Sequence, residues 1–352
     1  MAIKKKILIL IVAHVVGLSG VRYFHANGLP WMQVSSEEKA ARLGEANWGV
    51  IRVPVANFNE SQRFSASVVT QGLMGMPVRL LQQDGWYEAQ LPDGYTGWIH
   101  ASQIRRMTAK ELGEWNERPK LVVTSLSTNV RAVTSDEMVT VLPAGAHVVQ
   151  VRSLANDWIV ELPDGRQGRI ARDDVENLKD FQLKNVAARQ AVDFGQRLIT
   201  KAMHLKGVSY QWGGTSTAAM DCSGFIKTVF WMHDMILPRD ASQQAYIGER
   251  FDDKTLARSG DLYFFGSVGK DHRARISHVA MALGDDRFIH SLGDVHTASF
   301  NEKDADYDAY EKRRYLWSVR LDVSRSSPCW QTSSENGFYQ NPPQPLAVCK
   351  LR

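Results

Sequence analysis

The chain has 352 residues, which is long enough for two or three domains. Hydrophobic residues make up 44% of it and charged residues 23%, as in ordinary soluble globular proteins, so most of the chain is expected to fold. The net charge is +4, and Lys4, Lys5 and Lys6 contribute three of these charges. The remainder is nearly balanced, so bulk charge gives no support for nucleic-acid binding.

The N-terminus has a basic start followed by an apolar run from Ile7 to Gly20. The run is shorter than the roughly 20 residues of a membrane span and is typical of a secretory signal. Residues 1–25 are therefore predicted to be a signal peptide, and the protein is expected in the periplasm or cell envelope. Because His14 interrupts the run and no small-x-small cleavage site follows, an uncleaved anchor is the alternative. That anchor is the only membrane contact expected.

Residues 26–48 are predicted to form a short helical segment, because Ser35 and Glu38 have the spacing of a capping box. Short β-rich segments with turn residues then run to about Leu178. A helix signal interrupts them, where Thr108 and Glu111 again have capping-box spacing.

The β-rich half contains a repeat. The stretch WYEAQLPDGYTGWIH, from Trp86, matches DWIVELPDGRQGRIA, from Asp157. Each copy alternates apolar and polar residues into a Pro-Asp-Gly turn and out again, as a hairpin does. Two small β-barrels related by duplication are therefore predicted, over residues 49–106 and 119–179. The pattern resembles bacterial SH3 domains, most closely in the first copy.

The two copies differ in their aromatic residues. Tyr95 and Trp98 of the first copy are replaced by Arg166 and Arg169 in the second. Only the first therefore offers an aromatic surface suited to a ligand. The alternative for Trp98 is that it fills the core of its barrel, whereas Tyr95 lies at a turn tip, where side chains are normally exposed.

A mixed region of helices and strands follows from about Asn185. A helical stripe ends at Gly207 and is formed by Phe194, Leu198, Ile199, Ala202 and Met203. Three strand-like runs come later: DLYFFG from Asp261, ISHVAMALG from Ile276 and RFIHSLG from Arg287. An α+β domain is predicted over 186–325, and the tail at 326–352 is expected to be mostly loop.

The chain has three cysteines, Cys222, Cys329 and Cys349. The last two lie in the tail and are a reasonable pair for a disulfide in an oxidising compartment. Cys222 is then left over, either as a small core residue or as a reactive thiol. It lies at the N-terminal end of a predicted buried helix, because Asp221, Ser223 and Gly224 suit a helix start and the run GFIKTVFWM is apolar on both faces. At a helix start the free N–H groups and the dipole favour a thiolate and can stabilise an oxyanion.

A thiol nucleophile needs a base, and His278 and His290 are the candidates because both lie on predicted strands. If Gly284, Asp285 and Asp286 form a three-residue loop, the two histidines project from the same face and can touch diagonally. A two-residue loop would place them on opposite faces unless a bulge restored the register.

Six stretches stand out across residues 186–325: YQWGGTS, DCSGF, LPRDASQQA, SGDLYFFG, ISHVAMALG and RFIHSLG. They resemble, in the same order along the chain, the motifs of the NlpC/P60 family of papain-like cysteine peptidases. Two SH3 domains ahead of such a domain resemble the γ-D-glutamyl-L-diamino acid endopeptidases, which cut cell-wall peptides. The resemblance implies an α+β, papain-like catalytic domain preceded by two SH3-like barrels.

The resemblance also implies roles for residues of this chain. Cys222 would be the nucleophile, His278 the general base and His290 the group that orients it. Tyr210 would help to bind the oxyanion, and Tyr95 would close the pocket around the free N-terminus of a short peptide. The other residues that would line the substrate pocket are Trp212, Asp221, Ser223 and Asp240, with a helix cap as the alternative for Asp221.

Two departures from the related enzymes concern the substrate pocket. Ser67, before VTQ, stands where the relatives usually have an acidic residue that pairs with the ligand amine, and Glu60 is a nearby substitute. Ala241 stands where they often carry Ser, which removes a hydroxyl donor. Weaker recognition of the amine is therefore expected.

The hypothesis from the sequence is an exported, monomeric cysteine peptidase that cuts the γ-D-Glu to diamino acid bond of peptidoglycan-derived peptides with a free N-terminal L-Ala. No cofactor is expected, and no metal, because His278 and His290 lack a compact metal-binding spacing. The alternatives are an endopeptidase acting on intact wall, with the SH3 pair as anchors, and a non-catalytic wall-binding protein.

Overall fold

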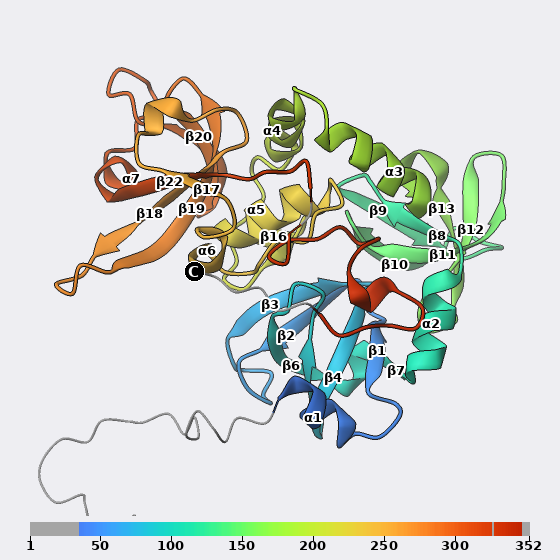
Figure 1. Ribbon diagram of the computed structural model, residues 1–352. Helices are drawn as coiled ribbons and strands as arrows, with labels where there is room; N and C mark the ends of the chain where they lie inside the picture. The colour runs from blue at the N-terminus through green and yellow to red at the C-terminus, as the bar shows by residue number, and fades with distance from the viewer. Residues whose placement is uncertain (1–34, 326, 347–352) are drawn as a thin grey trace, which may run out of the picture. The chain divides into compact units, whose positions relative to one another are not determined.

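The computed structural model describes residues 35–325 and 327–346 (Figure 1). The predicted signal peptide or anchor at 1–25 lies outside the described residues, as does Cys349. Within those described, none of the helices combines the length and apolar character needed to cross a bilayer. Helix α1 (Ser36–Ala41) begins directly after Ser35, inside the predicted helical segment, and packs on the first sheet.

The first β-domain is a seven-stranded antiparallel sheet with the strand order β3-β2-β6-β5-β4-β1-β7. Its core contains Phe58, Leu80 and Ile99. The strands are β1 (Trp48–Ile51), β2 (Val55–Asn59), β3 (Val68–Leu73), β4 (Pro77–Asp84), β5 (Trp86–Gln90), β6 (Thr96–His100) and β7 (Ile104–Met107).

The second β-domain repeats this topology strand for strand, with the order β10-β9-β13-β12-β11-β8-β14. Helix α2 (Ala109–Glu117) joins the two domains, and Thr108 and Glu111 form the predicted capping box at its start. The strands are β8 (Lys120–Val123), β9 (Ser127–Arg131), β10 (Met138–Pro143), β11 (His147–Ser153), β12 (Asp157–Glu161), β13 (Gln167–Ala171) and β14 (Val175–Asn177).

The remaining sheet has six antiparallel strands in the order β17-β22-β18-β19-β20-β21. The three predicted strands are present as β18 (Leu262–Val268), β19 (Ala274–Gly284) and β20 (Arg287–Leu292). The sequence did not predict α3 (Leu178–Arg189), β17 (Glu249–Phe251), β21 (Asp294–Ser299) or β22 (Tyr315–Arg320). The other elements are α4 (Phe194–His204), β15 (Thr215–Ser216), β16 (Ala219–Met220), α5 (Cys222–Trp231), α6 (Ala241–Gln244) and α7 (Ala309–Arg314).

Helix α5 is the central helix of this α+β domain. It packs against β19 and β20, and Figure 1 shows it in yellow beside the orange sheet. Helix α4 contacts α5 through the predicted stripe, with one correction: Met203 is 38% exposed, while the other four residues of the stripe are buried. The stripe is therefore narrower than the sequence indicated.

The tail has little regular structure, as predicted, apart from one 3₁₀ turn at Gly337–Tyr339. It is nevertheless packed. Phe338 is fully buried against Trp48, with ring centroids 5.0 Å apart, and Asn116 of α2 donates to the Phe338 carbonyl at 2.9 Å. Cys329 is disulfide-bonded and Cys222 is free. The predicted partner of Cys329 lies outside the described residues.

Candidate active site

Cys222 is the first residue of α5. Asp221 is the N-cap, and its Oδ1 accepts a hydrogen bond from the Gly224 N–H at 2.8 Å, which explains why the helix begins here. Every residue of α5 except Lys227 is buried, and Cys222 is 9% exposed. The N–H of Val279 on β19 donates to the Cys222 sulfur. The sulfur therefore lies beside the strand position that follows His278.

Burial has the largest effect on the pKa of the Cys222 thiol. Burial, and next the negative charge of Asp221, raise the pKa of the thiol to about 12. Hydrogen bonds from the Val279 and Ser223 N–H groups and the charge of Arg239 act in the opposite direction but are outweighed. The Ser223 N–H at the helix start thus acts in the predicted direction, but its effect on the pKa is smaller than that of burial. The buried thiol is protonated, and its reaction requires a base.

The hairpin that carries the two histidines combines both predicted alternatives. Asp285 and Asp286 have φ values of 49° and 60°, as in a two-residue type I′ turn, and Gly284 pairs with Arg287. A bulge after Ala282 then shifts the register, so Met281 pairs with Ile289, as a three-residue loop would have arranged.

The restored register puts the two histidines on one face of the sheet. The His278 Nε2 and His290 Nδ1 atoms are 2.9 Å apart, and both side chains are buried. Burial, followed by His290, Arg314 and His296, lowers the pKa of His278 well below its ordinary value. His278 is therefore a neutral imidazole that can accept a proton.

His290 has a second ring partner that the sequence did not reveal. Its Nε2 lies 3.0 Å from the Nε2 of His296, which pairs with it directly across β20 and β21. The Nδ1 of His296 lies 2.8 Å from Asp294 Oδ1. Burial, and next His296, lower the pKa of His290 to about 4. The signal for this strand was the run DVHTAS, separated from RFIHSL by Gly293 alone.

The loop before α5 brings the predicted oxyanion residue close to the thiol. Burial, and next the charges of Cys222 and Asp221, raise the pKa of Tyr210 to about 12. Gly213 has φ +79°, and a Cβ there would lie 2.3 Å from the Val68 carbonyl oxygen of β3. Only glycine allows this loop to pack so closely on the first β-domain. Trp212 is 68% exposed and is available to a ligand.

Asp221 and Ser223 are buried in a polar network with Arg239. The Arg239 guanidinium forms a salt bridge with the Asp221 carboxylate and donates to Ser223 Oγ at 2.8 Å. The other oxygen of Asp221, Oδ2, also accepts from the Gly213 N–H at 2.9 Å. Of the two alternatives for Asp221, the helix cap is thus observed. Direct contact of Asp221 or Ser223 with substrate stays a prediction.

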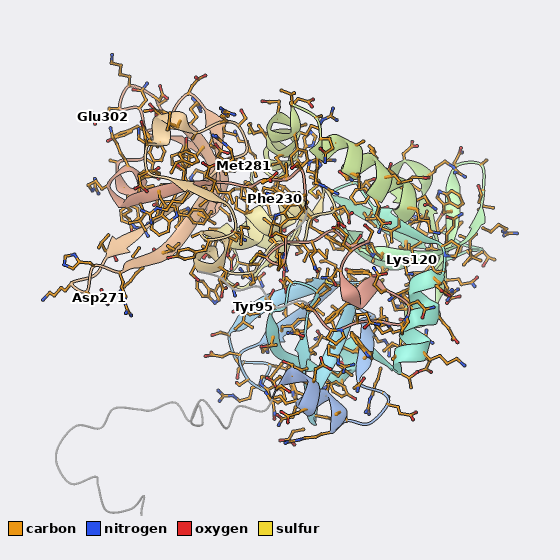
Figure 2. All side chains as sticks on the ribbon, viewed as in Figure 1. Tyr95, Lys120, Phe230, Asp271, Met281 and Glu302 are labelled. Carbon is orange, nitrogen blue, oxygen red and sulfur yellow. The ribbon has the colours of Figure 1, made fainter. Side chains whose placement is uncertain are left out.

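The first β-domain contributes Tyr95 to the region of α5 and α6. Its neighbour Asp93, whose side chain is fully buried, forms an ion pair with Lys227 of α5. The Tyr95 hydroxyl is hydrogen-bonded to Asp240, the N-cap residue of α6, and burial followed by Asp240 raises the pKa of Tyr95 to about 12. Figure 2 labels Tyr95 at the edge of the first β-domain. Two predicted site residues far apart in sequence therefore meet.

A pocket of about 440 Å³ lies beside Tyr95. Glu60, Glu88, Trp98 and Gln243 are among its lining residues. Trp98 is half-buried and lies outside the barrel core, so the core-filling alternative is wrong; the adjacent Ile99 fills the core instead. Glu60 thus supplies an acidic group to this pocket, in keeping with its suggested role as a substitute for the acidic residue that the related enzymes have at the position of Ser67.

The equivalent surface of the second β-domain is built from ion pairs. Arg166 lies 2.9 Å from Asp164, and Arg169 lies 2.8 Å from Asp136 and 3.4 Å from Asp157. These arginines occupy the positions of Tyr95 and Trp98.

Comparison with known proteins identifies two segments. Residues 207–314 match the NlpC/P60 family, and residues 60–104 match the bacterial dipeptidyl-peptidase Sh3 domain. In fold, the chain is similar to an NlpC/P60 family protein from Bacillus cereus ATCC 10987, with a TM-score of 0.66, 21% identity, and 78% of this chain and 99% of the other covered. It is also similar to an NlpC/P60 endopeptidase from Photobacterium damselae subsp. piscicida, with a TM-score of 0.57, 13% identity, and coverage of 80% and 74%.

Two curated relatives are similar in sequence. Gamma-D-glutamyl-L-lysine dipeptidyl-peptidase from Bacillus cereus is 28% identical over 234 residues, which cover 63% of this chain and 66% of the relative. Murein DD-endopeptidase MepS/Murein LD-carboxypeptidase from Escherichia coli K12 is 33% identical over 140 residues, which cover 38% and 66%. This chain thus spans slightly less than two thirds of each relative. With Cys222, His278 and His290 all inside the matched segment, this chain carries an NlpC/P60 domain, preceded by a bacterial dipeptidyl-peptidase SH3 domain.

Proposed function

We propose that the protein is a cysteine peptidase that hydrolyses the bond between γ-D-glutamate and a diamino acid in peptidoglycan-derived peptides. The observation that carries the proposal is the hydrogen bond from the Val279 N–H of β19 to the Cys222 sulfur, one residue after His278, whose ring is hydrogen-bonded to His290. The names of the two curated relatives, a dipeptidyl-peptidase and a murein endopeptidase, agree with this chemistry.

In the proposed mechanism His278 Nδ1 takes the proton of the Cys222 thiol, because its Nε2 is occupied by His290. The thiolate attacks the γ-carbonyl carbon of the substrate. Backbone N–H groups at the start of α5 and the Tyr210 hydroxyl stabilise the resulting oxyanion. The carbon–nitrogen bond then breaks, and His278 gives its proton to the departing amine. Water hydrolyses the thioester, with His278 as base, and restores the thiol.

The pocket beside Tyr95 is proposed to select peptides with a free N-terminal amine. Glu60 and Glu88 place two carboxylates in its lining, and because Glu88 is already paired with Lys39 at 2.8 Å, a substrate ammonium group is complementary to Glu60. Tyr95 and Asp240, joined by a hydrogen bond, would close the pocket at one side. An intact glycan-linked peptide has no free amine at this position, so trimmed peptides are favoured over whole wall.

We further propose that residues 119–179 form a second SH3 domain that supports the catalytic domain at 186–325 rather than binding ligand. The topology repeats that of the segment at 49–106, but the aromatic pair is absent. Its contact with the catalytic domain is direct: Trp231 Nε1 of α5 donates to the Gly145 carbonyl at 3.2 Å. The NlpC/P60 assignment favours action in the cell envelope, and we propose a monomer.

The function is tested with L-Ala-γ-D-Glu-diaminopimelate, its N-acetylated form and intact sacculi, with products identified by mass spectrometry. We expect release of L-Ala-γ-D-Glu from the free peptide at a rate at least tenfold above that from the acetylated form. Equal rates on the two peptides would refute amine selection. Turnover of sacculi alone would favour the wall endopeptidase, and binding without turnover would favour the non-catalytic alternative.

A further inference from the structure

Four side chains form a continuous chain of hydrogen-bonding groups from the candidate base to the surface. His278 Nε2 and His290 Nδ1 are 2.9 Å apart, and His290 Nε2 and His296 Nε2 are 3.0 Å apart. His296 Nδ1 then meets Asp294 Oδ1 at 2.8 Å and the Asp294 backbone oxygen at 3.2 Å. The first two rings are buried, whereas the side chains of His296 and Asp294 are 40% and 54% exposed.

The direction of this chain follows from its outer end. Both oxygens that face His296 Nδ1 are acceptors only, so this nitrogen must carry a hydrogen. In neutral His296 the Nε2 atom is then an acceptor, and His290 must donate to it from Nε2. His290 Nδ1 is consequently an acceptor for the Nε2–H of His278. His278 is left with a lone pair on Nδ1, the nitrogen that can take the thiol proton.

We propose that His296 and Asp294 are positioning residues that set the tautomers of His290 and His278, so that the basic nitrogen of His278 faces Cys222. This inference rests on the proposed function, because it concerns the base of that reaction. Neither residue touches the thiol.

His296 and Asp294 are needed because His290 alone cannot fix the direction of its hydrogen bond with His278. A bond between two neutral imidazoles can run either way, since each ring has one donor and one acceptor nitrogen. If the direction reversed, His278 would hold its hydrogen on Nδ1 and could not accept the thiol proton. The Asp294 carboxylate removes this symmetry because it cannot donate.

The test compares three substitutions of one residue. His296→Phe keeps a ring of similar size but removes the acceptor, and His296→Ala exposes His290 Nε2 to water. His296→Gln offers Oε1 as an acceptor and serves as the conservative rescue. We expect kcat to fall about three- to tenfold in His296→Phe and His296→Ala, with KM unchanged, as the misdirected tautomer becomes populated. We expect His296→Gln to recover most of the loss. His204→Ala, on the exposed end of α4, is the control and should match the parent.

A second measurement reads the tautomers directly. Long-range ¹H–¹⁵N correlation spectra of the full chain should show His278 and His290 protonated on Nε2 in the parent and in His296→Gln. A mixture or the Nδ1 form is expected for His278 in His296→Phe. A parent protein with His278 protonated on Nδ1, or a His296→Phe variant with unchanged tautomers and kcat, would overturn the proposal. If the parent fails to hydrolyse the peptide at all, the proposed function fails, while the spectra still decide the tautomers.

Discussion

The two β-domains have the same strand order but different relations to the candidate active site. The first places Tyr95, Trp98 and Glu60 around a pocket, and its Pro-Asp-Gly turn is held to α5 by the Asp93–Lys227 ion pair. The second has Arg166 and Arg169 at the aromatic positions, paired with neighbouring carboxylates. Two copies of one fold can thus differ in role, because ligand contacts depend on a few exposed positions while the rest of the fold can serve only as support. Matched substitutions in the two β-domains test this difference in role.

The largest expected effect concerns the two equivalent turns. The Asp93 side chain is fully buried and pairs with Lys227, whereas the equivalent Asp164, 7% exposed, pairs with Arg166 at 2.9 Å and also with Arg52 at 3.7 Å. Lys227→Met leaves a buried carboxylate without its partner and should lower the free energy of unfolding by about 3 kcal/mol. Arg166→Met should lower it by less than about 1 kcal/mol. Urea denaturation measures both. Equal losses would contradict the proposed difference between the turns.

The second effect is a pH dependence of the free energy of unfolding, which arises from His147 in the second β-domain and has no counterpart in the first. His147 on β11 occupies the position of Pro77 on β4, since they pair with Val122 and Val50 respectively. Burial, and next the charge of Lys120, lower the pKa of His147 to about 3. In the unfolded chain the pKa of His147 is about 6.5. At pH values between the two pKa values, the unfolded chain binds this proton and the folded chain does not. The free energy of unfolding therefore falls as the pH falls.

We expect the parent to lose about 2 kcal/mol more than His147→Phe between pH 7 and pH 5. Urea titrations at the two pH values measure this difference, and other titrating groups cancel in the comparison. Parallel losses in the two proteins would mean that His147 is not buried in its neutral form.

The third effect concerns ligand binding. Tyr95→Ala removes the hydroxyl that bonds to Asp240 and opens the side of the pocket. The KM for L-Ala-γ-D-Glu-diaminopimelate should rise roughly tenfold, because one buried contact and one hydrogen bond to a charged group are lost. The matched variant Arg166→Ala should leave KM within about twofold, since no proposed ligand contact lies there. A similar rise in both variants would refute the assignment of binding to the first β-domain.

The smallest effect separates charge from shape in the pocket. Glu60→Gln keeps the side-chain size but removes one of the two carboxylates that line it. The preference for the free peptide over its N-acetylated form should decrease about three- to fivefold, as expected for one partly exposed ion pair. Glu137→Gln, on the exposed surface of the second β-domain, is the control. An unchanged preference in Glu60→Gln would assign amine recognition to other residues.

Local patterns in the sequence were sufficient to predict the Thr108 capping box, the hairpins with their Pro-Asp-Gly turns, and the helix that begins at Cys222. They could not predict the bulge after Ala282, because its position depends on how β19 and β20 pack in the sheet. Helix α3 was missed because its apolar residues are too few to give a clear helical stripe.

The candidate site was predictable in its residues but not in its energetics. The family resemblance placed Cys222, His278 and His290 together, and these histidines do meet. The sequence indicated the contribution of the helix start to the thiol pKa, but not the larger and opposite effect of burial between α5 and β19, which is a tertiary effect. The contact between His296 and His290 depends on β21, a strand that the sequence did not reveal.

The most direct test of the central claim is mass-spectrometric analysis of L-Ala-γ-D-Glu-diaminopimelate after incubation with the parent protein and with Cys222→Ala. We expect L-Ala-γ-D-Glu and free diaminopimelate from the parent and intact peptide from Cys222→Ala. Hydrolysis by Cys222→Ala at the parental rate, or cleavage by the parent at the L-Ala bond instead, would contradict the claim.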